Sequence, residues 1–449
     1  MLSKTRFQYA MICRKRAWLD AHRRELARPP DAGLRLRLAD GHRVGRLARE
    51  LWAGGVLVTE PSARHARAAA RTSLLLEDAS VGAIFEGAFA HDGLRIRADV
   101  IARKGSSFEL VEVKASSRPR EEHLLDLAIQ AYVIDGSGVE LASTSLLHVD
   151  PAYVWDGGAH DLRALFVRVD FTEEVFRLLP DVRAHARDFR TVLAASTPPD
   201  VAMGPQCHKH DACPFLDVCR RESGAGARPG PDSSAVAAAI VLPVAAADGA
   251  PITLLDVQSF STALPRIAGT SPHERVPFLW SLRIVHADGA TEDHHALAPF
   301  GTDPRAELAD SLAARLPERG PIVFFSAVAP RALQALAARG IAGASACARR
   351  LESDGVDVLA RIENALGPRR EGDAWTWEAV VAAAGPGPQG APRPFSSRGE
   401  AAAAYVEAID RATPRSRRDA IVEALVRYGR ANLTALAALS GVARVGLRV

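Results

Sequence analysis

The chain has 449 residues, of which 48% are hydrophobic and 24% are charged, and its formal net charge is +3. This length exceeds what one compact core usually organises, so we expect two domains, and the composition excludes a disordered or fibrous chain. No run of about 18 apolar residues is present to span a bilayer, and the N-terminal residues lack the apolar core of a signal peptide. We therefore expect a cytoplasmic protein with no membrane partner.

Basic residues are concentrated at the start of the chain. Residues 1–50 contain 13 Lys and Arg against 5 Asp and Glu. Such a segment can contact phosphates, but an arginine-rich composition also produces solvated basic faces by chance. By itself, this excess does not identify a nucleic-acid partner.

The hydrophobic pattern predicts a first α/β domain over residues 1–222. A helix begins near Ser3, with Phe7, Met11 and Trp18 on one stripe. The pattern then predicts a second helix over 41–52, strands over 82–90, 93–102, 108–115 and 145–150, and a helix over 120–134. We find no internal repeat.

A change in composition separates this domain from a second one. Residues 220–239 are rich in Gly, Pro, Ser and Ala, which is typical of a linker, and we place the linker at 223–250. The second α/β domain then covers 251–449. It is expected to contain strands over 252–260, 278–286 and 321–329 and a helical tail over 416–439.

Two carboxylates and a lysine are expected to meet on a hairpin of the first domain. The turn sequence RKGSS separates the strands over 93–102 and 108–115. Glu112 and Lys114 face the same side of their strand, and Asp99 on the neighbouring strand can join them. Two adjacent carboxylates need a positive partner, and Mg²⁺ or Mn²⁺ suits oxygen ligands. The alternative is a surface hairpin with a cross-strand salt bridge.

The choice of lysine favours the metal site over the salt bridge. Only five of the 56 Lys and Arg residues are lysines, so Lys114 is unusual where arginine would serve a simple ion pair. Gln130 follows on a predicted helix, from which it can reach the same site. The lysine would then orient or deprotonate a water, or stabilise charge developing on a phosphate.

These motifs resemble a known nuclease family. The order GHRVG (41–45), RAD (97–99), EVK (112–114) and QAY (130–132) is similar to that of RecB-type PD-(D/E)xK nucleases. The resemblance implies a restriction-endonuclease-like α/β fold in which Asp99 and Glu112 hold the catalytic metal and Lys114 assists the attacking water. It also implies the Val113 carbonyl and His42 as metal ligands and Gln130 as a positioning residue. The tyrosine that the family often has four residues after this glutamine is Ile134 here.

Four cysteines indicate a second kind of site. Cys207, Cys213 and Cys219 are separated by five residues each, and Cys13 lies far upstream. In a reducing compartment, clustered cysteines favour metal binding, and a zinc site completed by His208 or His210 is one interpretation. The pattern also resembles iron-sulfur nucleases of the AddB and Cas-four type, which implies one [4Fe-4S] cluster held by all four thiolates. Cys347 is expected to be a small core residue.

The second domain resembles the RNase H-like DEDD exonucleases, beginning with the strand ITLLDVQSF. Asp256 remains at the first acidic position, but Gln258 and Asn432 stand where that family has carboxylates. An amide cannot supply the negative charge that holds a divalent cation, so we expect a degenerate, catalytically silent domain. Together, the two halves resemble bacterial proteins that fuse an iron-sulfur nuclease to a DEDD-type domain.

These observations predict a divalent-metal-dependent nuclease. The expected substrate is DNA, as single strands or ends, with RNA as the alternative. Two other hypotheses stay open at this point: a nucleic-acid-binding scaffold without turnover, and a zinc-bound protein that binds a protein partner.

Overall fold

The computed structural model describes residues 2–208, 213–223, 249–366, 375–383 and 393–442. It contains two compact units, and both are mixed α/β, as the sequence predicted. The first unit consists of Met1–Pro30, Arg37–Ser223 and Thr262–Glu274, and the second of Asp31–Leu36, Gly224–Ser261 and Arg275–Val449. Residues 262–274, which the sequence placed in the second domain, therefore belong to the first unit. Most of the predicted linker lies outside the described residues.

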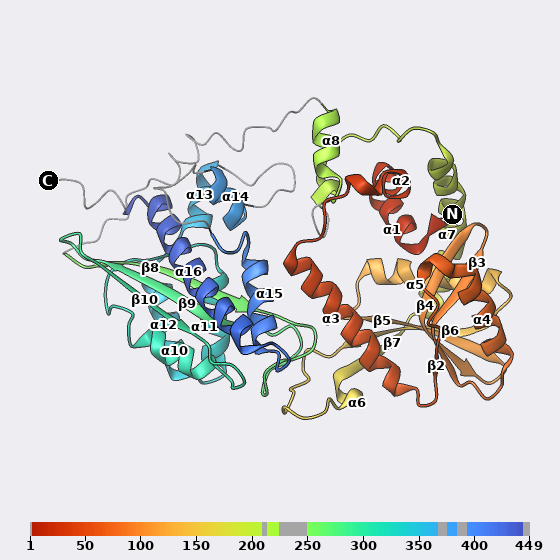
Figure 1. Ribbon diagram of the computed structural model, residues 1–449, viewed down its shortest axis with the longest axis horizontal. Helices are drawn as coiled ribbons and strands as arrows, with labels where there is room; N and C mark the ends of the chain where they lie inside the picture. The colour runs from red at the N-terminus through yellow and green to blue at the C-terminus, as the bar shows by residue number, and fades with distance from the viewer. Residues whose placement is uncertain (1, 209–212, 224–248, 367–374, 384–392, 443–449) are drawn as a thin grey trace. The chain divides into compact units, whose positions relative to one another are not determined.

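The first unit is built on one mixed sheet (Figure 1). Its order is β2-β3-β4-β5-β6-β7, with β1 paired to β4. The strands are β1 (Leu2–Ser3), β2 (Val56–Leu57), β3 (Ala83–His91), β4 (Leu94–Lys104), β5 (Ser107–Lys114), β6 (Leu141–Val149) and β7 (Phe166–Asp170). The predicted hairpin is confirmed, because β4 and β5 pair antiparallel on either side of a turn containing Gly105, whose φ is +63°. That value favours glycine, which has no Cβ to clash.

Helices cover both faces of this sheet. One apolar cluster joins its strands to five helices: α1 (Lys4–Ile12), α2 (Arg14–His22), α4 (His65–Glu77), α5 (Glu121–Gly136) and α7 (Thr172–Ala194). On the other face, a second cluster includes α3 (Ala32–Ala48) and α6 (Leu162–Leu165). Because both faces are covered, a charged side chain that is buried on β4 or β5 needs a compensating partner.

The helix predicted near Ser3 is divided at Cys13. This residue has an extended backbone with φ −158° and lies between α1 and α2 (Arg14–His22). The helix predicted over 41–52 instead runs from Ala32 to Ala48 as α3. Helices α4 and α7 were not predicted; α7 contains an internal proline, Pro180, which argues against a continuous helix in the sequence.

The second unit contains a five-stranded sheet of order β10-β9-β8-β11-β12. Strands β8 (Ile252–Phe260), β9 (Val276–Val285) and β10 (Thr291–Leu297) pair antiparallel, and β11 (Ile322–Phe324) and β12 (Gly355–Asp357) run parallel to β8. Its helices are α10 (Arg305–Ala313), α11 (Val328–Ala338), α12 (Ala342–Asp354), α13 (Val358–Leu366), α14 (Trp377–Ala383), α15 (Arg398–Ile409) and α16 (Arg415–Leu439). The predicted strand 321–329 was too long, because Val328 already begins α11.

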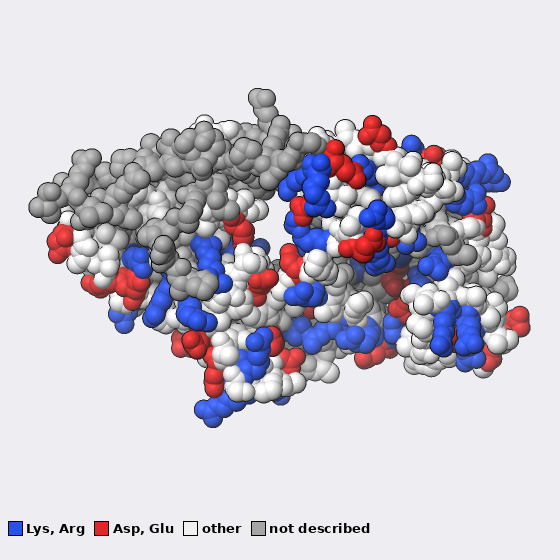
Figure 2. Space-filling view, turned by 45° about the horizontal axis from the view of Figure 1, so that its top comes forward, with Lys and Arg blue, Asp and Glu red and all other residues white. Residues whose placement is uncertain are grey.

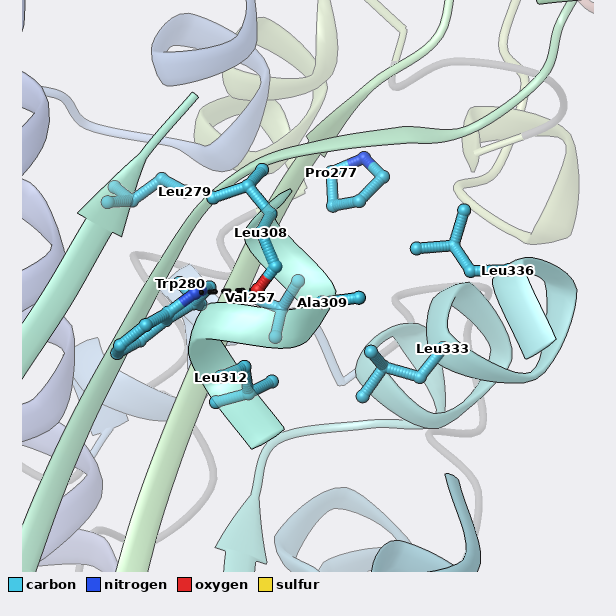
Figure 3. Close-up of a pocket in the computed structure, with 9 residues that line it drawn as sticks. All are labelled: Val257, Pro277, Leu279, Trp280, Leu308, Ala309, Leu312, Leu333 and Leu336. Carbon is cyan, nitrogen blue, oxygen red and sulfur yellow. Dashed lines mark hydrogen bonds between the residues drawn. The ribbon is translucent and has the colours of Figure 1, made fainter. Parts of the chain in front are cut away.

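A small cavity in the second unit is apolar (Figure 3). It encloses ≈ 10 Å³, which is room for at most one water molecule. The indole of Trp280, which lines it, is satisfied within the protein, because its Nε1 donates to the Leu308 carbonyl at 3.1 Å. The cavity is therefore a packing gap between β9, α10 and α11 rather than a ligand site.

Across the residues that the structure describes, no helix is both long enough and apolar enough to cross a membrane.

Candidate functional site

Asp99 lies where the hairpin pairing of β4 and β5 ends. The paired register runs from Lys104 and Ser107 to Val100 and Val111. Past the end of this register, the Asp99 carboxylate accepts a hydrogen bond from the Val113 backbone N–H at 2.8 Å. A side chain thus takes the place of a carbonyl of β4 as the acceptor for β5. The pairing of β4 with β3 continues on both sides of Asp99 but is interrupted at Asp99 itself. The carboxylate is thus fixed at an irregular point of a buried sheet.

The neighbouring strand β3 is also irregular at this point. Its residue Glu86 has φ +55°, a left-handed conformation that is unusual for a residue with a side chain. The Glu86 carboxylate pairs with Arg49 at 2.8 Å. Glu86 and Asp99 are therefore opposite each other on adjacent strands. The negative charge of Glu86 is compensated by Arg49.

Glu112 is buried on β5 and is held from the helix α5. Its side chain is 3% exposed, and its Oε2 accepts a hydrogen bond from Gln130 Nε2 at 2.7 Å. Asp126, one helical turn before Gln130, is equally buried. The buried face of α5 therefore presents a carboxylate and an amide to the strand that carries Glu112 and Lys114.

Two ammonium groups lie between the buried carboxylates. Lys114 Nζ is 2.7 Å from Glu112 Oε1 and 2.5 Å from Asp126 Oδ2. Lys4 Nζ, from the first residue of α1, is 3.2 Å from the same Glu112 oxygen and 2.9 Å from Asp126 Oδ1. Two of the five lysines of the chain thus converge on two carboxylates that they neutralise.

The titration behaviour follows from this arrangement. Burial raises the pKa of Asp99 above its usual value. Burial and Asp99 also act to raise the pKa of Glu112, but Lys114 and Lys4 outweigh them, so that this pKa is lowered. For Lys114, burial acts to lower the pKa, whereas Glu112 and Asp126 raise it well above its usual value. Glu112 and Lys114 are therefore a charged pair at neutral pH.

The donor set at this site suits a hard divalent cation. Asp99, Glu112, the Val113 carbonyl and the amide of Gln130 all offer oxygen, and Gln130 Oε1 is buried with no hydrogen-bond partner among the described residues. Within the described ranges, no three His, Cys, Asp or Glu side chains are already arranged to hold a metal. The chemistry of these ligands fits Mg²⁺ or Mn²⁺, while the charge of Glu112 is compensated by lysines.

The position of His42 relative to this site is set by α3. His42 is exposed on α3. Val44 and Ala48 of the same helix belong to one apolar cluster with Val111 and Val113 of β5. These two valines alternate with Glu112 along the strand, so they point to the opposite face of the sheet. In the part of the chain that the structure describes, no hydrogen bond or ion pair joins the His42 ring to Asp99 or Glu112. Tyr132 also points elsewhere, because its hydroxyl donates to Asp92 at 3.0 Å.

The four cysteines of the predicted cluster come from three segments. Cys13 lies between α1 and α2, Cys207 in the short helix Pro205–His208, and Cys219 on α8 (Leu216–Glu222). The Cys213 N–H donates to the Cys207 carbonyl at 2.8 Å. Burial raises the pKa of Cys213 and of Cys219, and Cys13 and Cys207 raise both further. Packing of Trp18 and Leu19 with Phe215 and Val218 places the segment after Cys13 beside the segment that carries Cys213 and Cys219.

Several contacts hold the N-terminal helices beside this group. Arg28 pairs with Asp217 at 2.6 Å, and Lys15 with Glu222 at 2.7 Å. A set of four thiols fits either a [4Fe-4S] cluster or zinc. His210, named above as a zinc ligand, lies outside the described residues. A buried apolar cluster that Cys213 contacts completes the packing and consists of Trp18, Leu19, Phe215 and Val218.

In the second unit, the buried Asp256 carboxylate is enclosed by three side chains. Its Oδ2 accepts from Gln258 Nε2 at 2.7 Å and from Asn432 Nδ2 at 2.9 Å, and its Oδ1 pairs with Arg398 at 3.1 Å. Asn432 is fixed in turn by the Trp377 indole, which donates to its Oδ1 at 3.1 Å. One carboxylate, one guanidinium and two amides form a neutral, hydrogen-bonded network.

The fifth cysteine, Cys347, lies apart from the other four. It is buried on α12, as expected for a small core residue.

Two residues of the carboxylate site were missed in the sequence. Lys4 is one of only five lysines, and the rarity of lysine that singles out Lys114 singles out Lys4 equally. Asp126 is a charged residue in the apolar run LLDLAIQA, four residues before Gln130, and such a residue on a buried helix face needs a partner. Both signals were present in the sequence, but neither identifies the partner.

Comparison with known proteins gives little further information. A family model described as a domain of unknown function, DUF2779, matches residues 253–364. No curated protein matches the chain. A solved structure, "Crystal structure of SSO0001", is 15% identical and covers 40% of this chain and 94% of its own, with a TM-score of 0.17. A TM-score this low is no basis for inferring a shared fold.

Buried His123 makes the stability of the first unit depend on pH. Its Nδ1 has no hydrogen-bond partner among the described residues, and burial together with the Lys114 ammonium lowers its pKa to about 4, from 6.5 in an unfolded chain. Between these values the unfolded state binds more protons, so the free energy of unfolding should fall as the pH is lowered. In urea unfolding at about pH 5 and about pH 7.5, His123→Gln should lose less stability on acidification than the parent. An equal loss in both proteins would contradict this assignment.

Proposed function

We propose that the first unit is a divalent-metal-dependent nuclease of the RecB-like PD-(D/E)xK type. The observation that carries this proposal is the convergence of Asp99, Glu112, Lys114 and Gln130 at one buried point of the sheet. An exposed salt bridge would need neither the burial of Glu112 nor a hydrogen bond from Gln130. Burying charges is costly, and functional sites are where such arrangements concentrate.

Each residue has a role that follows from its position. Asp99 and Glu112 are the cation ligands, with the Val113 carbonyl beside them, and the Gln130 amide holds Glu112 in place. We assign Lys114 as a cation rather than a base, because its ammonium pairs with both Glu112 and Asp126. Its ammonium is therefore suited to orienting a water and stabilising a phosphate that gains negative charge.

Hydrolysis of a phosphodiester requires few further groups. The water oxygen bonds to phosphorus, the bond from phosphorus to one sugar oxygen breaks, and the proton lost by water is balanced by the one that the leaving oxygen takes up. A bound divalent cation supplies Lewis-acid activation and neutralises charge on the phosphate. Asp99 and Glu112 fix where this occurs, and Lys114 supplies a positive charge beside it.

We further propose that Cys13, Cys207, Cys213 and Cys219 hold one [4Fe-4S] cluster. The support is that two regions far apart in the chain, the one around Cys13 and the one over residues 207–219, are joined by ion pairs and an apolar cluster. Such a group closes a long loop of chain and so stabilises the unit.

The second unit is proposed to be a degenerate, RNase H-like exonuclease domain. Its mixed sheet, with two antiparallel neighbours and then two parallel strands, is compatible with that assignment. Arg398 supplies the positive charge at Asp256 that an active site would leave to metals. This domain therefore serves binding or support rather than cleavage.

DNA is the proposed substrate, as single strands or ends, in a protein that we place in the cytoplasm. On the face drawn in Figure 2, basic and acidic side chains are interspersed. The preference for a phosphodiester therefore rests on the chemistry at Lys114 and on the basic N-terminal segment. End-labelled single- and double-stranded substrates with Mn²⁺ identify the substrate directly, and RNA serves as the competing substrate.

The role of Lys114 is tested by replacing it with arginine. An exposed ion pair would tolerate Lys114→Arg at a cost of about 0–1 kcal/mol. If the compact ammonium serves catalysis, Lys114→Arg should keep the fold and most of the DNA affinity while turnover falls by about 10²–10³-fold. Asp99→Ala and Glu112→Ala should lose both turnover and Mn²⁺ binding. Lys104→Arg, at the far end of β4, is the matched control and should cleave at the parental rate. Undiminished cleavage by Lys114→Arg would contradict a catalytic role for Lys114 and favour a structural salt bridge.

The cluster assignment is tested by colour and iron content. Protein purified without oxygen should be brown and absorb broadly near about 400 nm, whereas a zinc thiolate site is colourless. Cys13→Ser should bleach the protein and lower its melting temperature, because one ligand and the closure of the loop are lost. Cys347→Ala, at a buried cysteine of the second unit, should keep full iron. If Cys13→Ser retains full iron and sulfide, Cys13 is not a ligand.

The expected lack of catalytic activity in the second unit is tested in the full chain. All metal-dependent cleavage should disappear in Asp99→Ala, while Asp256→Asn should cut at the parental rate, since Asp256 holds no catalytic metal. Both rates are measured with Mg²⁺ and with Mn²⁺ at equal iron content. Residual cleavage in Asp99→Ala that vanishes when Asp256 is also changed would show a second active site.

A further inference from the structure

Lys4 is the residue of the carboxylate site that the nuclease resemblance does not assign. Its ammonium contacts Asp126 Oδ1 at 2.9 Å and Glu112 Oε1 at 3.2 Å, and Lys114 contacts the other Asp126 oxygen and the same Glu112 oxygen. Two carboxylates and two ammoniums therefore alternate in a closed ring. Asp99 lies outside this ring and accepts from the Val113 backbone instead.

The position of Lys4 is fixed by the fold of the first unit. Leu2 and Ser3 form β1, which pairs with the start of β4, and the Ser3 side chain caps α1 by accepting the Arg6 N–H. Three residues after Lys4, Phe7 is fully buried and packs edge-on against Phe189 with ring centroids 5.0 Å apart. The Lys4 side chain is only 21% exposed. It is therefore a built part of the site rather than a surface lysine that happens to lie near it.

The charges of this group determine how strongly it attracts a cation. Asp99, Glu112 and Asp126 contribute three negative charges, and Lys4 and Lys114 contribute two positive ones. Without Lys4, a second uncompensated negative charge would lie within the site. Both oxygens of Asp126 are engaged, because Oδ1 accepts from Gln130 Nε2 at 3.3 Å and pairs with Lys4, and Oδ2 pairs with Lys114. Cation affinity in oxygen sites rises with the number of charged ligands.

We propose that Lys4 is a positioning residue that keeps Asp126 out of the cation's ligand set and so limits the affinity of the site for its metal. The cation is then held by Asp99 and Glu112, and Asp126 acts through the lysines rather than on the metal. This inference deepens the proposed nuclease function and rests on it, since it concerns the metal of the same site. It is decided by metal binding in the absence of nucleic acid, so it does not depend on observing cleavage.

The test is a double-mutant cycle in which Mn²⁺ is titrated into the full chain. Binding is measured by electron paramagnetic resonance or calorimetry. Lys4→Met keeps most of the side-chain stem but removes the charge, and should bind Mn²⁺ at least about tenfold more tightly. Asp126→Asn leaves the lysines under-compensated and should bind Mn²⁺ about tenfold more weakly. The double variant changes no net charge and should return close to the parental affinity.

Two controls separate charge from packing. Lys104→Met removes one lysine charge from the first unit at a position bonded to Ser143, outside the site, and should leave Mn²⁺ affinity unchanged. Lys4→Arg keeps the charge and should not show the tighter Mn²⁺ binding expected of Lys4→Met. A purely structural role for Lys4 predicts instead that Lys4→Met and Asp126→Asn both weaken Mn²⁺ binding and lower the melting temperature, and this result would overturn the inference.

The outcomes also distinguish this inference from the proposed function. A parent that binds Mn²⁺ but cleaves no nucleic acid contradicts the nuclease function, while the direction of the Lys4→Met shift still decides the role of Lys4. A parent that cleaves while Lys4→Met shows unchanged Mn²⁺ affinity contradicts the inference alone. Failure of every variant to bind Mn²⁺ overturns the inference as well, because there is then no affinity for Lys4 to limit.

Discussion

The constraint on which the first unit depends is the compensation of buried carboxylates. Glu112 and Asp126 are each about 2% exposed, and an unpaired charge at such a position is strongly destabilising. Lys4 and Lys114 satisfy both groups at once, and the Gln130 amide takes the remaining Glu112 oxygen. The strand, the N-terminal helix and α5 must therefore meet at one point for the unit to be stable, and we place the chemistry at that same point.

Helix α1 connects this point to the thiol group. It begins at Lys4 in the carboxylate site and is followed directly by Cys13, and its nine residues span about 14 Å. Phe7 and Ala10 bury its inner face against the sheet and α7. Lys15, two residues after Cys13, pairs with Glu222 on α8, so the same N-terminal segment would contribute to both proposed sites. A short, basic N-terminal segment thus has two anchoring roles that differ in chemistry.

The second unit solves the same electrostatic problem differently. Asp256 is also buried, but its partners are the guanidinium of Arg398 and the amides of Gln258 and Asn432. A planar guanidinium and two neutral amides satisfy the carboxylate fully and leave no oxygen in need of a cation. In the first unit, by contrast, Gln130 Oε1 is buried without a partner among the described residues, and the Asp99 carboxylate is held by a backbone N–H. This difference is the basis on which we propose a catalytic role for the first unit and a supporting role for the second.

The sequence by itself determined the mixed α/β class, the hairpin of β4 and β5, and the placing of Glu112 and Lys114 on one face, because strand alternation and turn chemistry are local properties. It did not determine the division of the first helix at Cys13, the early end of β11 at Phe324, or the placing of residues 262–274 with the first unit.

Nor did the sequence reveal that Lys4 and Asp126 complete the site. Lys4 lies 108 residues from Glu112 along the chain, and only the pairing of β1 with β4 and the packing of α1 beside α5 bring their charges together. Contacts of that kind depend on how separate elements pack, so they cannot be predicted from residue pattern and local spacing.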